Sequence, residues 1–145
     1  MDNRPLGIFD SGLGGLTCIE PLLKALPDER ILYFGDTART PYGSKSPETV
    51  QAFSLQIADF LVARGAKILA IACNTISSTA IPMLQDRYQD IPVVGIIRPA
   101  ASEIASRYGK KHSVGIIGTK VTVQSRAYED AIARYNPSLH ICTKA

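Results

Sequence analysis

A cysteine stands where a buried strand should end and polar residues begin. Residues 71–79 read IACNTISST, so Cys73 closes a run of small apolar residues and is followed at once by Asn74 and Thr75. A thiolate can take up a proton, and the start of a helix favours the thiolate form of cysteine. The neighbouring amide and hydroxyl can orient a polar ligand. This pattern predicts proton transfer at Cys73, with an inert buried thiol as the alternative.

Two further loops carry groups suited to a small polar ligand. The stretch DSGLGG, residues 10–15, brings Asp10 and Ser11 to the end of a strand, and its glycines let the backbone turn into a helix. The stretch TPYGSKS, residues 40–46, offers hydroxyls and backbone amides that suit a small carboxylate. The residues of interest in this second loop are Pro41, Tyr42, Gly43 and Ser44.

The glycines of the first loop also raise a dinucleotide-binding alternative. That fingerprint is G-x-G-x-x-G, but here Gly12 and Gly14 are followed by Thr17. Asp36 follows the next strand, where a ribose-binding acid sits in such folds. This alternative gives Cys73 no role.

A later pair, Thr119 and Thr122, either contacts a ligand or caps the helix that follows.

Short apolar runs alternate with helical patterns, which indicates an α/β fold with a parallel sheet and helices on both faces. The predicted strands are 6–9, 31–34, 68–72, 93–97, 114–117 and 139–142. The predicted helices are 16–27, 46–65, 78–88, 99–108 and 121–134. Parallel strands end at a common edge, where ligands bind. We therefore expect Asp10, Tyr42 and Cys73 to cluster there.

The helix over 46–65 has the clearest ends. Ser46 suits the cap, Pro47 the first helical position, and Gly65 a left-handed residue after the last turn. Apolar residues at helical spacing predict the face that this helix buries. They are Val50, Phe53, Ile57 and Leu61.

Composition excludes several classes of function. The 145 residues include 46% hydrophobic and 20% charged residues, with a formal net charge of +3, as in ordinary globular proteins. The basic residues are scattered, so we expect no nucleic-acid or membrane partner. The N-terminus has no long apolar stretch typical of a signal peptide, and the cytoplasm is the expected location.

The cysteines and histidines predict neither a disulfide framework nor a metal site. The three cysteines are odd in number and widely spaced, and His112 and His140 are the only histidines. Cys18 falls in the first apolar helix, where a core role is expected. Cys142 lies in a short strand and is assigned no chemistry.

Five stretches together resemble the cofactor-independent aspartate/glutamate racemase family, and within it the glutamate racemases. They are GIFDSGLGGLT (7–17), YFGDTARTPYGSKSPE (33–48), ACNTISS (72–78), VVGIIRPA (93–100) and GIIGTKVTVQSRAY (115–128). The resemblance nearly spans the chain. It implies two α/β domains around a cleft, with residues 1–97 forming the first domain and residues 98–145 an incomplete start of the second.

The same resemblance implies a function. Cys73 matches the first of two cysteines that exchange the α-proton of glutamate from opposite faces, and Asp10 matches a carboxylate that assists the transfer. The implied enzyme interconverts L- and D-glutamate for peptidoglycan, needs no cofactor or metal, and forms a homodimer. The substrate contacts that the resemblance implies are Asp10, Ser11, Pro41, Tyr42, Gly43, Ser44, Asn74, Thr75, Thr119 and Thr122.

Two departures from the family pattern qualify that expectation. Ile76 stands where the family commonly has alanine. The second catalytic cysteine belongs to a Gly-Cys-Thr-His stretch that this sequence lacks, and Cys142 is followed by Thr143 and Lys144 instead. We therefore expect a fragment of a longer racemase whose 145 residues alone do not racemise glutamate. A non-catalytic amino-acid-binding or interaction module is the alternative.

Overall fold

The computed structural model describes residues 2–145 and contains two parallel sheets. The larger sheet has the strand order β2-β1-β3-β4, and the smaller one pairs β5 with β6. The strands are β1 (Leu6–Asp10), β2 (Ile31–Gly35), β3 (Ile68–Ile71), β4 (Val93–Gly95), β5 (Ser113–Ile117) and β6 (His140–Lys144). All six predicted strands are present, and each end lies within two residues of its predicted position.

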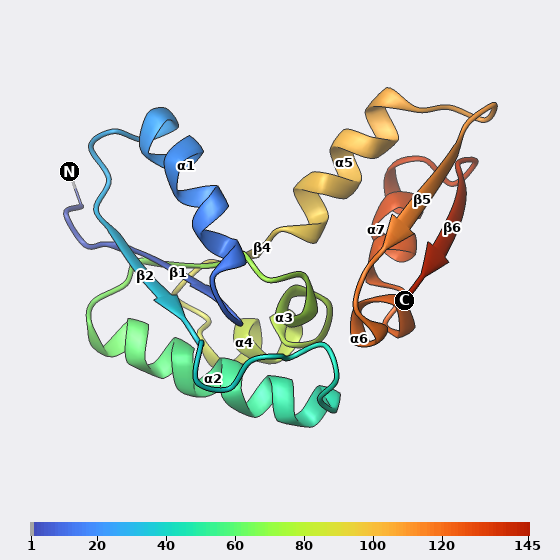
Figure 1. Ribbon diagram of the computed structural model, residues 1–145. Coiled ribbons are helices and arrows are strands. Elements are labelled where there is room, and N and C mark those ends of the chain that lie inside the picture. The colour runs from blue at the N-terminus through green and yellow to red at the C-terminus, as the bar shows by residue number, and fades with distance from the viewer. Residues whose placement is uncertain (1) are drawn as a thin grey trace.

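Helices lie on both faces of the larger sheet, which confirms the predicted fold class. In Figure 1, α1 lies on one side of this sheet, while α2 and α4 lie on the other. The helical elements are η1 (Gly14–Cys18), α1 (Ile19–Ala25), α2 (Pro47–Ala63), α3 (Asn74–Thr79), α4 (Ile81–Arg87), α5 (Ile97–Arg107), α6 (Lys120–Gln124) and α7 (Ala127–Tyr135).

Three predicted helices have a different extent in the structure. The helix expected over 78–88 is two helices, α3 and α4, because Pro82 fits the first turn of a new helix but not the interior of an old one. The helix expected over 121–134 divides at Arg126, whose φ of 56° is left-handed. The helix expected over 16–27 begins as the 3-10 turn η1 and ends at Ala25.

The ends of α2 are as predicted. The Ser46 hydroxyl accepts a hydrogen bond from the Thr49 amide at 3.3 Å, and Pro47 is the first helical residue. Gly65, just beyond the helix, has a φ of 82°. Phe53 is only partly buried, and the Arg39 guanidinium lies 4.2 Å above its ring. The other three residues of the predicted stripe, Val50, Ile57 and Leu61, are at most 1% exposed.

The chain forms two units with separate apolar cores. The first unit, comprising β1–β4 and α1–α4, packs α2 and α4 against the larger sheet. The second unit, comprising α5–α7, β5 and β6, is centred on Ala101, Ile132 and Leu139. Figure 1 shows the second unit beside the first, joined through the segment between β4 and α5. No helix within residues 2–145 is long and apolar enough to cross a membrane.

The first helical segment contributes less to the core than its sequence suggests. None of the residues of α1 is buried, and Leu16 and Leu23 are 48% and 46% exposed. Cys18, expected in the core, is only half-buried where η1 meets α1. The apolar pattern therefore predicted the helix but not the burial of its apolar face.

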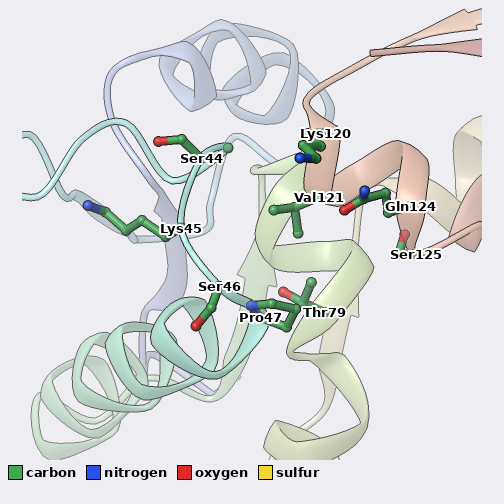
Figure 2. A pocket seen from close by; sticks show the side chains of 10 residues that line it. Ser44, Lys45, Ser46, Pro47, Thr79, Lys120, Val121, Gln124 and Ser125 are labelled. Carbon is green, nitrogen blue, oxygen red and sulfur yellow. The ribbon is translucent and has the colours of Figure 1, made fainter.

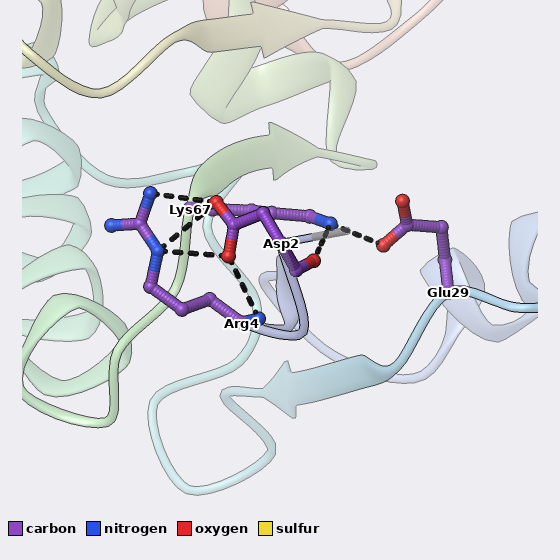
Figure 3. A network of polar contacts seen from close by, with 4 residues as sticks. All are labelled: Asp2, Arg4, Glu29 and Lys67. Carbon is purple, nitrogen blue, oxygen red and sulfur yellow. Dashed lines mark hydrogen bonds and ion pairs between the residues drawn. The ribbon is translucent and has the colours of Figure 1, made fainter.

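A polar cluster joins three chain segments at the amino ends of the strands. Lys67 Nζ lies 2.6 Å from Glu29 Oε2 and donates to the Asp2 carbonyl at 2.8 Å (Figure 3). Its side chain is only 12% exposed. Arg4 hydrogen-bonds the Asp2 carboxylate, which lowers the pKa of that carboxyl to about 2. Lys67 thus ties the starts of β1, β2 and β3 to one another.

We expect Lys67→Met to lower the free energy of unfolding by about 1 kcal/mol, because it removes a largely buried charged donor from two acceptors. The matched control is Lys24→Met. Lys24 lies the same 2.6 Å from Glu20, but that pair is 74% and 77% exposed. Its loss should change stability by less than about 0.5 kcal/mol. Urea denaturation measures the free energy of unfolding of both variants. Equal losses in the two would contradict a stabilising role for the Lys67 contacts.

Candidate functional site

The parallel register of β1 and β3 brings two predicted site residues into contact. Phe9 is the register partner of Ile71. Two residues farther along the chain from each, just beyond the strand ends, the Cys73 thiol donates a hydrogen bond to the Ser11 hydroxyl at 3.2 Å. Both groups therefore lie at the carboxyl edge of the larger sheet, as expected for a ligand site in such a fold.

Cys73 is the capping residue of α3. The Ile76 amide donates to Cys73 Sγ at 3.5 Å, and the Ser77 amide donates to the Cys73 carbonyl at 2.9 Å. The residue is 6% exposed. The sulfur thus faces two groups of different kinds, a helix amide on one side and the Ser11 hydroxyl on the other.

Asp10 ends β1 and is held by its own loop. Its Oδ2 accepts a hydrogen bond from the Gly15 amide at 2.8 Å, and the residue is 6% exposed. A Cβ on Gly15 would lie 2.8 Å from Asp10 Cβ and 2.9 Å from Ala72 Cβ, so only glycine allows this close approach. The glycine-rich loop thus packs against the ends of β1 and β3 and fixes the Asp10 carboxylate there.

Tyr33 is a neighbour of this loop that sequence reasoning missed. Its hydroxyl donates to the Gly12 carbonyl at 3.2 Å. Burial raises the pKa of this hydroxyl, and the nearby charges of Asp10, Cys18 and Cys73 raise it further. The only sequence signal was that Tyr33 belongs to the short apolar run of β2. It indicates burial on a sheet face but not proximity to a loop.

The Tyr42 hydroxyl is hydrogen-bonded inside the protein, whereas the loop sequence suggested a hydroxyl presented to a ligand. Tyr42 is 1% exposed, and its hydroxyl donates to Asp36 Oδ2. The same oxygen lies 2.5 Å from Arg39 Nε. Asp36 is therefore an internal anchor for the loop, since its carboxylate is already paired and 4% exposed. What Tyr42 can still offer a ligand is its backbone.

The rest of this loop reaches the second unit. Pro41 and Ser44 are exposed. A Cβ on Gly43 would lie 2.5 Å from Thr119 Cγ2, so the absence of a side chain lets Thr119 approach the loop. The Thr40 hydroxyl donates to the Ser11 carbonyl and so joins the first two loops.

The predicted threonines form a chain of hydroxyls between the units. The Thr119 hydroxyl hydrogen-bonds the hydroxyls of Thr75 and Thr122, each at 3.0 Å. It also accepts from the Thr122 amide at 3.3 Å, so Thr119 caps α6 as the capping alternative predicted. Thr75 and Thr122 are 4% and 3% exposed. Asn74, which is exposed, accepts a hydrogen bond from the Tyr128 hydroxyl at 2.7 Å.

Two pockets flank this contact between the units. One, of about 360 Å³, lies between the 43–47 segment and α6, and in Figure 2 the Lys45 side chain extends away from it. The other, of about 380 Å³, lies between α5 and β5, and Asn74, Thr119, Thr122 and Tyr128 help to line it. Within residues 2–145, neither pocket is lined by Asp10 or Cys73. No group of three or more His, Cys, Asp or Glu side chains in this range could hold a metal ion.

The Asp/Glu/hydantoin racemase family matches residues 11–145. The chain is 53% identical to the glutamate racemase of Geobacter metallireducens, covering 98% of this chain and 52% of that protein. Among solved structures, it resembles the glutamate racemase of Francisella tularensis in complex with D-glutamate, with a TM-score of 0.88, 43% identity and coverage of 99% and 53%. For glutamate racemase from Aquifex pyrophilus, the TM-score is 0.90 at 38% identity, with coverage of 97% and 54%. The chain spans about half the length of the curated relatives it matches.

The Tyr42–Asp36 pair predicts a pH dependence of stability. Burial, followed by the hydrogen bond to Asp36, raises the pKa of the Tyr42 hydroxyl well above its ordinary value. Above about pH 10 the unfolded chain ionises this tyrosine while the folded chain does not. The free energy of unfolding therefore falls with rising pH, by up to about 1.4 kcal/mol per pH unit from this group.

We expect Tyr42→Phe to show a shallower loss of stability between pH 10 and 11.5, because phenylalanine cannot ionise. The variant should also be less stable at pH 7 by about 1–2 kcal/mol, because Asp36 loses a buried donor. Tyr135→Phe serves as the control, since Tyr135 is 47% exposed. Urea denaturation at each pH gives the slopes, and identical slopes for wild type and Tyr42→Phe would refute the expectation.

Proposed function

The chain belongs to the Asp/Glu/hydantoin racemase family, and from that membership we propose that it carries half of a glutamate racemase site, with Cys73 as one proton-transfer group. The observation that supports this most directly is the position of Cys73. Its sulfur lies at the carboxyl edge of a parallel sheet, between the Ser11 hydroxyl and the Ile76 amide.

The proposed chemistry is an exchange of the α-proton of glutamate. The Cys73 thiolate removes the proton from one face, and the sulfur thereby becomes a thiol. The Ile76 amide, which donates to the sulfur at 3.5 Å, holds the sulfur at the start of α3. A second acid delivers a different proton to the opposite face, and the centre is inverted. In the reverse direction Cys73 is the acid.

We assign the second proton transfer to neither of the other cysteines. Cys142 lies exposed on β6, where its Sγ is 3.8 Å from His140 Nδ1. Cys18 is half-buried between η1 and α1. The proposal therefore requires a second group beyond those that the described residues supply, and it treats residues 98–145 as the beginning of a second domain.

The ligand groups proposed for glutamate are neutral donors and acceptors. The backbone of Tyr42 and Gly43, the Ser11 hydroxyl and the Asn74 amide suit the carboxylate and ammonium groups of a zwitterion. Asp10 is proposed to assist the proton transfer. Pro41, Ser44, Thr75, Thr119 and Thr122 complete the proposed contacts. We further propose that the D-glutamate formed serves peptidoglycan synthesis in the cytoplasm and that the enzyme is a homodimer.

A non-catalytic amino-acid-binding module is the second candidate function. The observation that favours it is that the side chains of Asn74 and Thr75 are already hydrogen-bonded to the second unit, as in a structural interface. Isothermal titration with each glutamate enantiomer, combined with a racemisation assay, separates the two functions. Binding without turnover in the complete protein would favour the module.

In the complete protein, we expect Cys73→Ser to lower kcat by about 10²- to 10⁴-fold in both directions, because a serine hydroxyl is far less acidic than a thiol and cannot serve as the base. Circular dichroism of the reaction follows L-to-D and D-to-L conversion separately. The protein's own far-ultraviolet spectrum should be unchanged, since serine is nearly isosteric with cysteine.

Cys142→Ser is the matched control and should retain wild-type turnover, because that thiol is exposed on β6. Unchanged turnover of Cys73→Ser in either direction would remove Cys73 from the mechanism. A complete wild-type protein, with both domains, that interconverts no glutamate at all would refute the proposed function itself.

A further inference from the structure

Two tyrosines of α7 make hydrogen bonds through their side chains, but only one reaches the first unit. The Tyr128 hydroxyl donates to Asn74 Oδ1 at 2.7 Å. Tyr135, near the other end of the same helix, accepts from Arg98 Nε at 3.3 Å within the second unit. Nothing in the sequence motifs gave Tyr128 a role, yet it touches a residue adjacent to Cys73.

The bond to Tyr128 decides which way the Asn74 amide faces. An asparagine side chain carries an acceptor oxygen and a donor NH₂ group on opposite sides of one carbon. With Oδ1 held by the Tyr128 hydroxyl, rotation about the last side-chain bond would break that hydrogen bond. The NH₂ group is therefore kept directed away from Tyr128, where its two N–H donors suit a carboxylate.

The surroundings of Tyr128 suit a fixed donor. The side chain is half-buried and lines the pocket of about 380 Å³ together with Asn74 and Thr119. Burial raises the pKa of its hydroxyl, so the phenol stays protonated near neutral pH. The helix that carries it is anchored in the second core by Ile132, which is 0% exposed.

We propose that Tyr128 is a positioning residue of the site: it orients Asn74 so that the Asn74 NH₂ group binds a carboxylate of the amino-acid ligand. This inference rests on the proposed racemase function. The Thr75–Thr119 hydrogen bond at 3.0 Å supports the same arrangement, because it fixes the neighbouring residue of α3 against the second unit.

The primary test is Tyr128→Phe in the purified complete protein, with both domains. Losing the orientation of a ground-state contact should raise KM for glutamate about 2- to 10-fold, as expected for one hydrogen bond, with kcat changed less than about 2-fold. Tyr135→Phe is the matched control, because it removes a hydroxyl from the same helix away from Asn74. Its KM should equal that of the wild type.

An Asn74→Ala background tests whether Tyr128 acts through Asn74. If it does, Tyr128→Phe should raise KM no further once Asn74 is alanine, so the two effects are non-additive. The same fold increase in both backgrounds would overturn the proposal. An unchanged KM for Tyr128→Phe in the wild-type background would overturn it as well.

A readout independent of activity keeps this proposal separate from the proposed function. Nitrogen-15 NMR observes the Asn74 side-chain NH₂ signals directly, and Tyr128→Phe should shift them while Tyr135→Phe does not. If the complete wild-type protein fails to racemise glutamate but the signals shift, the function is wrong and the contact is real. If the signals do not move, the positioning role is wrong whatever the activity.

Discussion

The pairing of β1 with strands on both sides is the constraint on which the rest of the site depends. All five residues of β1 are buried, and it hydrogen-bonds β2 on one side and β3 on the other, both in parallel. The ladder continues past the strand ends, with the Asp36 amide on the Asp10 carbonyl at 3.0 Å and the Ala72 amide on the Phe9 carbonyl at 2.9 Å. Three loops with different chemistry therefore begin at one edge.

The strands and the ends of α2 were predicted well, because residues close together in the chain determine them. The strands are short apolar runs, and the ends of α2 follow from Ser46, Pro47 and Gly65, whose conformational preferences act within one turn of the chain. The position of Cys73 at a strand end and helix start was visible for the same reason. Its contact with Ser11 then follows from parallel register, which aligns equivalent positions of β1 and β3.

Features that depend on distant partners were not predictable from these patterns. The loop sequence suggested that Tyr42 presents its hydroxyl to a ligand, but that hydroxyl donates to Asp36, whose carboxylate is also paired with Arg39. Tyr128 lies 54 positions from Asn74 along the chain, so no local pattern links the two. Cys18 has the apolar neighbours of a core residue, yet it is only half-buried. The helix that follows it, α1, has no buried residue.

The short helix α3 joins the two halves of this arrangement. Its capping residue, Cys73, contacts Ser11 of the first unit, and its first two residues, Asn74 and Thr75, hydrogen-bond Tyr128 and Thr119 of the second. A helix of six residues has little internal stability, so its orientation depends on these outside contacts. Any change in the placement of the second unit must therefore move the groups beside the thiol. The position of the Cys73 sulfur is thus set by contacts with both units, even though every covalent neighbour of Cys73 belongs to the first.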